Sequence, residues 1–262
     1  MYQIPEGEKN SKGRAIQNLI QIPPDDKVRA IVDVRDLKNE DFVNSHYIVL
    51  CTKRGVIKKT SLEDFSRPRM TGVNAITIIE DDHLLEAKLT DGSCEIMMAL
   101  KSGRAIRFAE EKVRPTGRGA IGVGGIEVDD ANDEVIGMIC VNTADKKRTI
   151  MVVSEKGFGK RTAIDEYRVT NRGGKGVKTI NVTDKTGKLV GILDVTEEQD
   201  LMITCKSGVT IRMPVIGISE QGRATQGVKL IRLDERDGIA AITALDEHVE
   251  NGTGIVSVPD NQ

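Results

Sequence analysis

The chain has 262 residues and a formal net charge of −2, with 38 Lys and Arg against 40 Asp and Glu. Trp is absent and aromatic residues make up only 3%, which argues against proteins that bind single strands or RNA by stacking bases on aromatic rings. No signal peptide and no apolar run near the ~18 residues needed to span a bilayer are found, so we expect a cytoplasmic protein that does not associate with membranes.

Short apolar segments rich in β-branched residues follow one another along the chain, separated by polar and glycine-containing turns. Their lengths of about five or six residues fit β-strands, and no segment has the 3.6-residue periodicity of a helix. We expect strands at residues 30–34, 47–50, 75–79, 95–99, 135–140, 150–153, 189–193 and 201–204, and the segment 239–245 opens a further unit. The sequence therefore predicts an all-β protein.

The chain repeats itself about every 50 residues. Each copy has a tight turn around a glycine, and a cation stands four residues after that glycine. The turn glycines are Gly55, Gly103, Gly157 and Gly208, and the cations are Lys59, Arg107, Arg161 and Arg212. About 21 to 23 residues after each turn glycine a second shared element, Gly-Val-x-x-Ile, ends at Ile76, Ile126, Ile180 and Ile231. Such periodicity is typical of an array of one supersecondary unit, which cannot bury its apolar face alone.

About four strands per unit, with a turn between each pair, are typical of a propeller blade. We expect a β-propeller-like ring of about five to six blades of four-stranded sheets, in which neighbouring units supply strands to one another. The array is expected to be N-terminally truncated, because residues 2–6 align with residues 61–65 while no basic turn precedes them. Residues 1–248 would form this domain, and residues 249–262 a loosely ordered tail with one short strand at 255–258.

Charge is segregated within each unit. Between residues 101 and 126 six cations outweigh two carboxylates, whereas residues 127–134 carry five carboxylates and no cation. The next copy repeats the contrast between residues 156–178 and residues 194–200. In a closed array the basic halves would line one rim and create a field that the net charge conceals. Alternatively, the basic turns neutralise acidic edges of adjacent blades.

Glycines and cations are combined in the loop Arg172-Gly173-Gly174-Lys175-Gly176, and weaker versions recur at residues 11–14, 69–72, 116–119 and 222–227. We call these segments box loops. Glycine lets a phosphate backbone approach closely, and Lys and Arg suit phosphate contacts that position DNA without reading its sequence. The spacing Gly117-x-Gly119-x-x-Gly122 matches a dinucleotide-binding fingerprint, but that site needs a following helix, and a strand is expected here.

The box loop at 172–176 and the stretch 157–163, followed by Glu166-Tyr167, resemble the C-terminal domain of DNA gyrase A, and the resemblance covers residues 1–248. It implies a β-pinwheel whose basic rim wraps duplex DNA, within a bacterial, nucleoid-associated type IIA topoisomerase. The homologous C-terminal domain of topoisomerase IV, with fewer blades and degenerate boxes, is an alternative. The strongest box of the gyrase family lies in a first blade, ahead of where this chain begins.

The resemblance further implies a domain that is not catalytic by itself and that directs ATP-dependent negative supercoiling by the whole enzyme. Its partners would be double-stranded DNA, the rest of DNA gyrase A, and DNA gyrase B. ATP and Mg²⁺ would be held by other domains, so no cofactor and no metal site are expected in this chain.

The predicted DNA-binding residues are the cations and glycines of the turns and box loops. They are Lys12, Arg14, Lys53, Arg54, Lys58, Lys59, Arg69, Lys101, Arg104, Arg107, Arg114, Arg118, Lys156, Lys160, Arg161, Arg172, Gly173, Gly174, Lys175, Gly176, Lys178, Lys206, Arg212, Arg223 and Lys229.

The sequence gives little support for a catalytic site. The three histidines are scattered, no serine lies in a nucleophile elbow, and Tyr167 is expected to pack rather than to cleave DNA. Two other classes stay open. A protein-interaction propeller would need an exposed apolar patch, and a propeller hydrolase would need carboxylates that converge on its channel.

Overall fold

The computed structural model describes residues 7–8, 11–15, 18, 22, 26–34, 36–67, 69, 72–145, 147–234 and 236–246. The chain forms two compact units. Unit 1 comprises Met1–Met98, Ile106–Asn142 and Val169–Gly176, and unit 2 comprises Ala99–Ala105, Thr143–Arg168 and Val177–Gln262. The predicted strand at 255–258 and the boundary at residue 248 lie outside the described residues.

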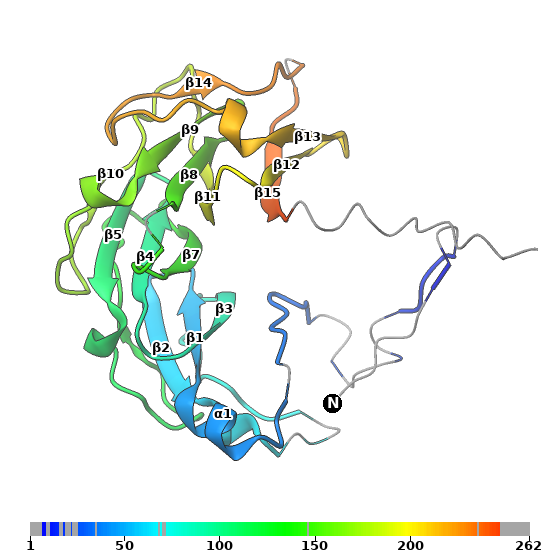
Figure 1. The fold of residues 1–262 in the computed structure, drawn as a ribbon, viewed down its shortest axis with the longest axis vertical. Helices are drawn as coiled ribbons and strands as arrows, with labels where there is room; N and C mark the ends of the chain where they lie inside the picture. Colours follow the sequence, from blue (N-terminus) through cyan, green and yellow to red (C-terminus); the bar gives the residue numbers. More distant parts are fainter. Residues whose placement is uncertain are drawn as a thin grey trace, which may run out of the picture. The chain divides into compact units, whose positions relative to one another are not determined.

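Each sheet is built around one antiparallel hairpin whose turn contains a turn glycine (Figure 1). The four hairpins are β1 (Tyr47–Thr52) with β2 (Val56–Ser61), β4 (Glu95–Leu100) with β5 (Arg104–Ala109), β8 (Thr149–Ser154) with β9 (Phe158–Ala163), and β12 (Asp200–Cys205) with β13 (Thr210–Pro214). The positive φ angles of these glycines, between 80° and 90°, suit only glycine in so tight a turn.

Later segments of the chain add the remaining strands. A seven-residue strand pairs with the first strand of each hairpin, and a two-residue strand pairs with the second strand of three hairpins. The seven-residue strands are β3 (Leu84–Thr90), β7 (Val135–Val141), β11 (Leu189–Val195) and β15 (Ile239–Leu245). The two-residue strands are β6 (Val123–Gly124), β10 (Val177–Lys178) and β14 (Val228–Lys229). The sheet orders are β3-β1-β2-β6, β10-β5-β4-β7, β11-β8-β9-β14 and β13-β12-β15.

This arrangement confirms the all-β class, the four-stranded sheets and the exchange of strands between copies. Four sheets lie in the described residues, and the count of five to six blades stays a prediction beyond them. The strand segments that we expected match the observed strands, except residues 30–34 and 75–79, which form none. Segments at these places in the other copies pair with a hairpin that comes earlier in the chain. The described residues contain no hairpin before residue 30, so these two segments have no such partner among them.

Helices are short. A six-residue helix, α1 (Glu40–Ser45), begins where the Asn39 side chain accepts a hydrogen bond from the Phe42 backbone N–H at 3.0 Å. It is too short to show a 3.6-residue periodicity, and sequence reasoning missed it. A 3₁₀ turn follows the second strand of every hairpin: η2 (Leu62–Phe65), η3 (Glu110–Lys112), η4 (Ile164–Glu166) and η5 (Val215–Gly217).

Each unit has its own apolar core. In unit 1 the buried residues Val43, Ile48, Leu50 and Leu62 come from α1, β1 and η2. In unit 2 a larger cluster surrounds Met151, Val153, Leu201 and Ile203, and β15 closes it with Ile239. The described residues contain no helix long and apolar enough to cross a membrane.

Candidate nucleic-acid interface

The two sequence elements that every copy shares contact each other in three of the four sheets. The carbonyl oxygen of Gly55 accepts hydrogen bonds from the backbone N–H groups of Gly125 and Ile126, at 2.8 and 3.3 Å. Gly103 binds Thr179 and Ile180 in the same way, and Gly157 binds Leu230, next to Ile231. A β-carbon added to Gly55 would lie 2.4 Å from the Ile126 carbonyl oxygen. The turn glycine is therefore required for the next copy to dock.

Successive box loops are joined to one another by main-chain hydrogen bonds. The residue after three of the four shared isoleucines donates its N–H to a carbonyl in or directly beside the next box loop. Thr77 donates to Ala120 at 3.2 Å and Glu127 to Gly174 at 3.0 Å, both in unit 1. Within unit 2, Asn181 donates to Thr225 at 3.0 Å. In unit 1 the box loops at 69–72, 116–119 and 172–176 thus follow one another at a spacing set by the backbone.

Lysine ammonium groups of the preceding hairpin hold two of the box loops by hydrogen bonds. The buried Lys58 of β2 donates to the carbonyl oxygens of Ala75 and Arg118, each at 2.6 Å. Lys160 of β9 makes the same kind of contact with the carbonyl oxygens of Gly222 and Arg223. The equivalent residue in β5 is Ile106, against which Gly174 packs. An apolar side chain can therefore occupy this position.

The contact between Lys160 and its box loop should make the stability of unit 2 depend on pH. Burial lowers the pKa of Lys160 to about 8, from 10.5. Between these values the unfolded chain binds more protons than the folded chain, so the stability of unit 2 should rise with pH. We expect a rise of up to about 3 kcal/mol from pH 8 to 10.5 that a Lys160→Met variant lacks, measured by urea unfolding at each pH. Parallel pH profiles for the two proteins would refute it.

The four cations that stand in phase after the turn glycines do not share an exposed surface. Lys59, Arg107 and Arg161 are only 4 to 8% exposed. Lys59 lies 3.4 Å from the buried Glu110 carboxylate, Arg107 pairs with Glu95, and Arg161 lies 2.9 Å from Glu197. The expectation of an exposed rim is wrong for these three side chains, because strands and 3₁₀ turns from the next copy or the same sheet cover them. Their contact with phosphate stays a prediction, and it would require these ion pairs to open.

Arg212, the fourth of these cations, is 37% exposed and lies 2.5 Å from Asp200. The alternative interpretation, in which basic turns neutralise acidic edges of adjacent blades, describes Lys59, whose partner Glu110 belongs to the next copy. It does not describe Arg107 and Arg212, whose partners Glu95 and Asp200 lie on the first strand of the same hairpin. The backbone of these cations also matters, since the carbonyl groups of Lys59, Arg107 and Arg161 accept the N–H groups of Thr116, Thr170 and Gln221, where the next copy approaches.

Most of the other predicted site residues are accessible. The exposed ones are Lys12, Arg14, Arg54, Arg69, Arg104, Arg114, Lys156, Gly173, Lys175, Lys178, Lys206 and Lys229. The half-buried ones are Lys53, Lys101, Arg118, Arg172, Gly174, Gly176 and Arg223. Lys58 and Lys160 are buried, like the three in-phase cations above.

Two box loops of unit 1 meet at a shared depression. Arg69 and Arg118 line it from the box loops at 69–72 and 116–119, together with Gly72 and Gly119, and its volume is about 370 Å³. The Thr77 hydroxyl donates to the Gly119 carbonyl at 2.8 Å and holds the loops together. Two guanidinium groups over a glycine-lined hollow suit a phosphate oxygen better than a base edge.

The strongest box loop is braced by the copy before it. The Arg172 guanidinium donates to the carbonyl oxygens of Lys112 and Gly124, each at 3.0 Å, while Lys175 lies 2.8 Å from Asp129 and is 61% exposed. The acidic segment 127–134 also reaches Lys53, through Glu134 at 2.9 Å. The acidic segment 127–134 therefore already neutralises part of the basic charge of the neighbouring copies.

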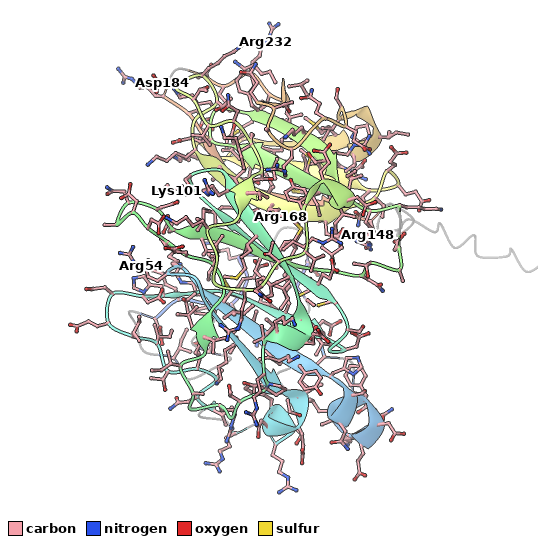
Figure 2. All side chains as sticks on the ribbon, turned by 90° about the vertical axis from the view of Figure 1, so that its left-hand side faces the viewer. Arg54, Lys101, Arg148, Arg168, Asp184 and Arg232 are labelled. Carbon is pink, nitrogen blue, oxygen red and sulfur yellow. The ribbon has the colours of Figure 1, made fainter. Side chains whose placement is uncertain are left out.

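Sequence reasoning left two exposed cations, Arg67 and Arg168, out of the predicted site. Arg67 lines a second depression with Arg69 and Arg118. Arg168 is exposed and labelled in Figure 2. It stands eight residues before Gly176, as Arg114 stands eight residues before Gly122, so its phase in the repeat was the signal that could have identified it.

The other residues and motifs that could indicate catalysis or ligand binding show no such site in the described residues. Tyr167 is buried, as expected, and its hydroxyl lies 2.5 Å from the Thr179 hydroxyl. The spacing Gly117-x-Gly119-x-x-Gly122 runs into strand β6 rather than a helix. All four cysteines are free thiols. No group of three metal-ligating side chains occurs within the part of the chain that the structure describes.

The four repeating sheets also match a known family segment by segment. The family model described as "DNA gyrase C-terminal domain, beta-propeller" matches residues 46–91, 95–142, 148–196 and 199–246, one match for each hairpin and its seven-residue strand. The chain belongs to the DNA gyrase C-terminal domain family. DNA gyrase A of Staphylococcus aureus strain NCTC 8325 / PS 47 is 41% identical over 252 residues, which cover 96% of this chain and 28% of that protein.

Solved structures of this family have the same fold. The C-terminal domain of DNA gyrase A superimposes with a TM-score of 0.77 at 25% identity, over 89% of this chain and 75% of that one. The C-terminal domain of DNA topoisomerase IV gives a TM-score of 0.80 at 21% identity, over 89% and 71%. The chain thus spans less than a third of the curated DNA gyrase A and resembles its C-terminal domain.

Proposed function

We propose that this chain binds duplex DNA through the phosphate backbone, using its box loops as successive contact points. The observation that carries the proposal is the hydrogen-bonded series of three box loops in unit 1, each of which presents glycines and exposed or half-exposed cations at a spacing set by the backbone. Bending DNA costs about 1 to 6 kcal/mol per 20 to 30 base pairs, so contacts must recur along the path. A repeated series supplies such contacts.

Backbone contact suits this chain better than base reading. Lys and Arg beside glycines reach phosphates, and the few aromatic rings include Tyr167, which is buried, and Phe158, over which Lys229 lies. Because none of the Phe and Tyr rings that the structure describes is exposed, discrimination between base sequences should be weak. The domain would therefore bind DNA of any sequence with similar affinity.

Membership of the gyrase family supports a wrapping role within a larger enzyme. In that role the domain is not catalytic by itself. It would bend DNA so that the rest of DNA gyrase A and DNA gyrase B, with ATP and Mg²⁺ on other domains, introduce negative supercoils in the bacterial cytoplasm. A protein-interaction propeller is the second class, and the DNA-binding test below separates the two.

The salt dependence of binding tests the proposal. If about six to ten phosphates are neutralised, affinity for a duplex should fall by about 10³ to 10⁵ between 50 and 200 mM salt. Fluorescence anisotropy with two duplexes of unrelated sequence measures this. Equal slopes for the two duplexes are expected, and a flat response to salt, or no binding at 50 mM, would reject DNA binding.

A further inference from the structure

Among the residues that the structure describes, the fourth sheet has no counterpart of the two-residue strand that completes the other three. In unit 2, β9 pairs with β14 through Phe158 and Gly159, whereas β13 ends its sheet among the described residues. A β-carbon placed on Gly157 would collide with Ile231, but one placed on Gly208 meets nothing within 4 Å. The docking place that the turn glycine offers to the next copy is therefore open at Gly208.

Exposure of the neighbouring side chains agrees with an uncovered edge. Val209 is 56% exposed, while Phe158 at the same position of β9 is 6% exposed. The burial of β13 alternates between exposed and half-buried residues, whereas nearly all of β9 is buried. An unpaired strand edge of this kind presents unsatisfied backbone groups that attract another strand.

The sequence after β15 contains a segment that fits this edge. Residues Gly254-Ile255-Val256-Ser257-Val258 read Gly-Ile-x-x-Val, a variant of the shared Gly-Val-x-x-Ile pattern that keeps apolar β-branched residues at the second and fifth positions. Each docked copy of this pattern has its fifth residue against a turn glycine and its third residue exposed, as Lys178 and Lys229 show. We propose that residues 254–258 form the fourth strand of the last sheet by pairing with β13.

The connection is long enough. From Leu245 at the end of β15 the segment must pass β12 and β13, three strand spacings of about 4.8 Å, and about five residues along them, which together make a path of about 22 Å. The eleven residues from Asp246 to Val256 span about 36 Å when extended. The tail can therefore reach the far edge of its own sheet.

The register follows from the other sheets. Val56 faces Gly124, Arg104 faces Lys178 and Phe158 faces Lys229, so the residue after each turn glycine faces the third residue of the pattern. In the fourth sheet Val209 would face Val256, and Thr210 would face Ile255. The Gly208 carbonyl would accept the N–H groups of Ser257 and Val258, as Gly55 accepts those of Gly125 and Ile126.

Hydrogen exchange of the β13 backbone, measured by mass spectrometry on the full chain, tests the proposal with two matched variants. Val258→Lys places a charge at the position that Ile126 and Ile180 bury, whereas Val256→Lys places it where Lys178 and Lys229 are already exposed. We expect exchange of residues 206–214 to accelerate about tenfold in Val258→Lys and in a chain ending at residue 250, and to stay unchanged in Val256→Lys. Exchange of β8 and β9 should stay the same in all of them, which excludes general unfolding.

Three results would overturn the proposal. Equal exchange of β13 in the full and shortened chains would mean that the tail does not cover this edge. Equal effects of the two lysine variants would mean that the tail acts without the proposed register. Protection that rises with protein concentration, or that survives the shortened chain but is lost when residues 11–16 are removed, would assign the edge to a second copy or to the first box loop.

Discussion

Replacing Gly55 by alanine is expected to lower the free energy of unfolding of unit 1 by about 3 to 5 kcal/mol. The alanine β-carbon would lie 2.4 Å from the Ile126 carbonyl oxygen, which is backbone and cannot rotate away, and φ at this position is +85°. The segment that carries β6 must then move and give up its hydrogen bonds to Gly55. Urea unfolding followed by circular dichroism measures the loss.

Gly72→Ala is the matched control for this variant. Gly72 lies in the same unit with a φ of +73°, but nothing lies within 4 Å of its added β-carbon. Its substitution should cost about 1 kcal/mol, from backbone strain alone. Equal losses in the two variants would show that close approach of the next copy at Gly55 does not hold the sheets together.

Removing both guanidinium groups of the unit 1 depression is expected to have the largest effect on DNA binding. In an Arg69→Gln, Arg118→Gln double variant we expect affinity at 100 mM salt to fall at least about tenfold, and the slope of log affinity against log salt to decrease by about 2. The backbone carbonyl of residue 118, which accepts a hydrogen bond from Lys58, is kept in this variant, so the box loop should stay in place. Fluorescence anisotropy across a salt series measures both quantities.

A charge-matched control separates the depression from net charge. Arg29 and Lys38 are exposed in the same unit and lie outside every box loop. An Arg29→Gln, Lys38→Gln variant changes the net charge equally and should keep nearly the affinity and slope of the unsubstituted chain. If the two double variants lose affinity equally, binding depends on overall charge and the box loops have no special role.

Local patterns in the sequence predicted the first strand and the turn of each hairpin, but not the second strands β2, β5, β9 and β13. The turn glycines and the apolar runs on either side of them are local features, and β1, β4, β8 and β12 lie where those runs predicted strands. The strand exchange between copies also followed from the count of strands per repeat. These features depend on backbone conformation and on alternation of side chains, which neighbouring residues determine.

The exposure of the cations could not be predicted in the same way. Lys59 is buried because Glu110, 51 residues away, reaches it from the next copy, and Arg161 is covered by segments 36 and 57 residues away. One clue was present: Lys58 and Lys160 stand where other copies have Ile106 and Ile211, which indicates a buried aliphatic stem. Recurrence of a charge in phase therefore indicated ion pairs with carboxylates of the same hairpin or of another segment, not a shared solvent-exposed surface.

Chiral wrapping of duplex DNA is the central claim, and the linking number of a closed circle measures it directly. A nicked plasmid is sealed by ligase in the presence of this chain, and topoisomers are resolved after removal of the protein. We predict a shift in mean linking number at about 50 mM salt that vanishes near 200 mM and shrinks in the Arg69→Gln, Arg118→Gln variant. An unchanged distribution at a protein concentration that saturates the plasmid would contradict wrapping and leave only binding.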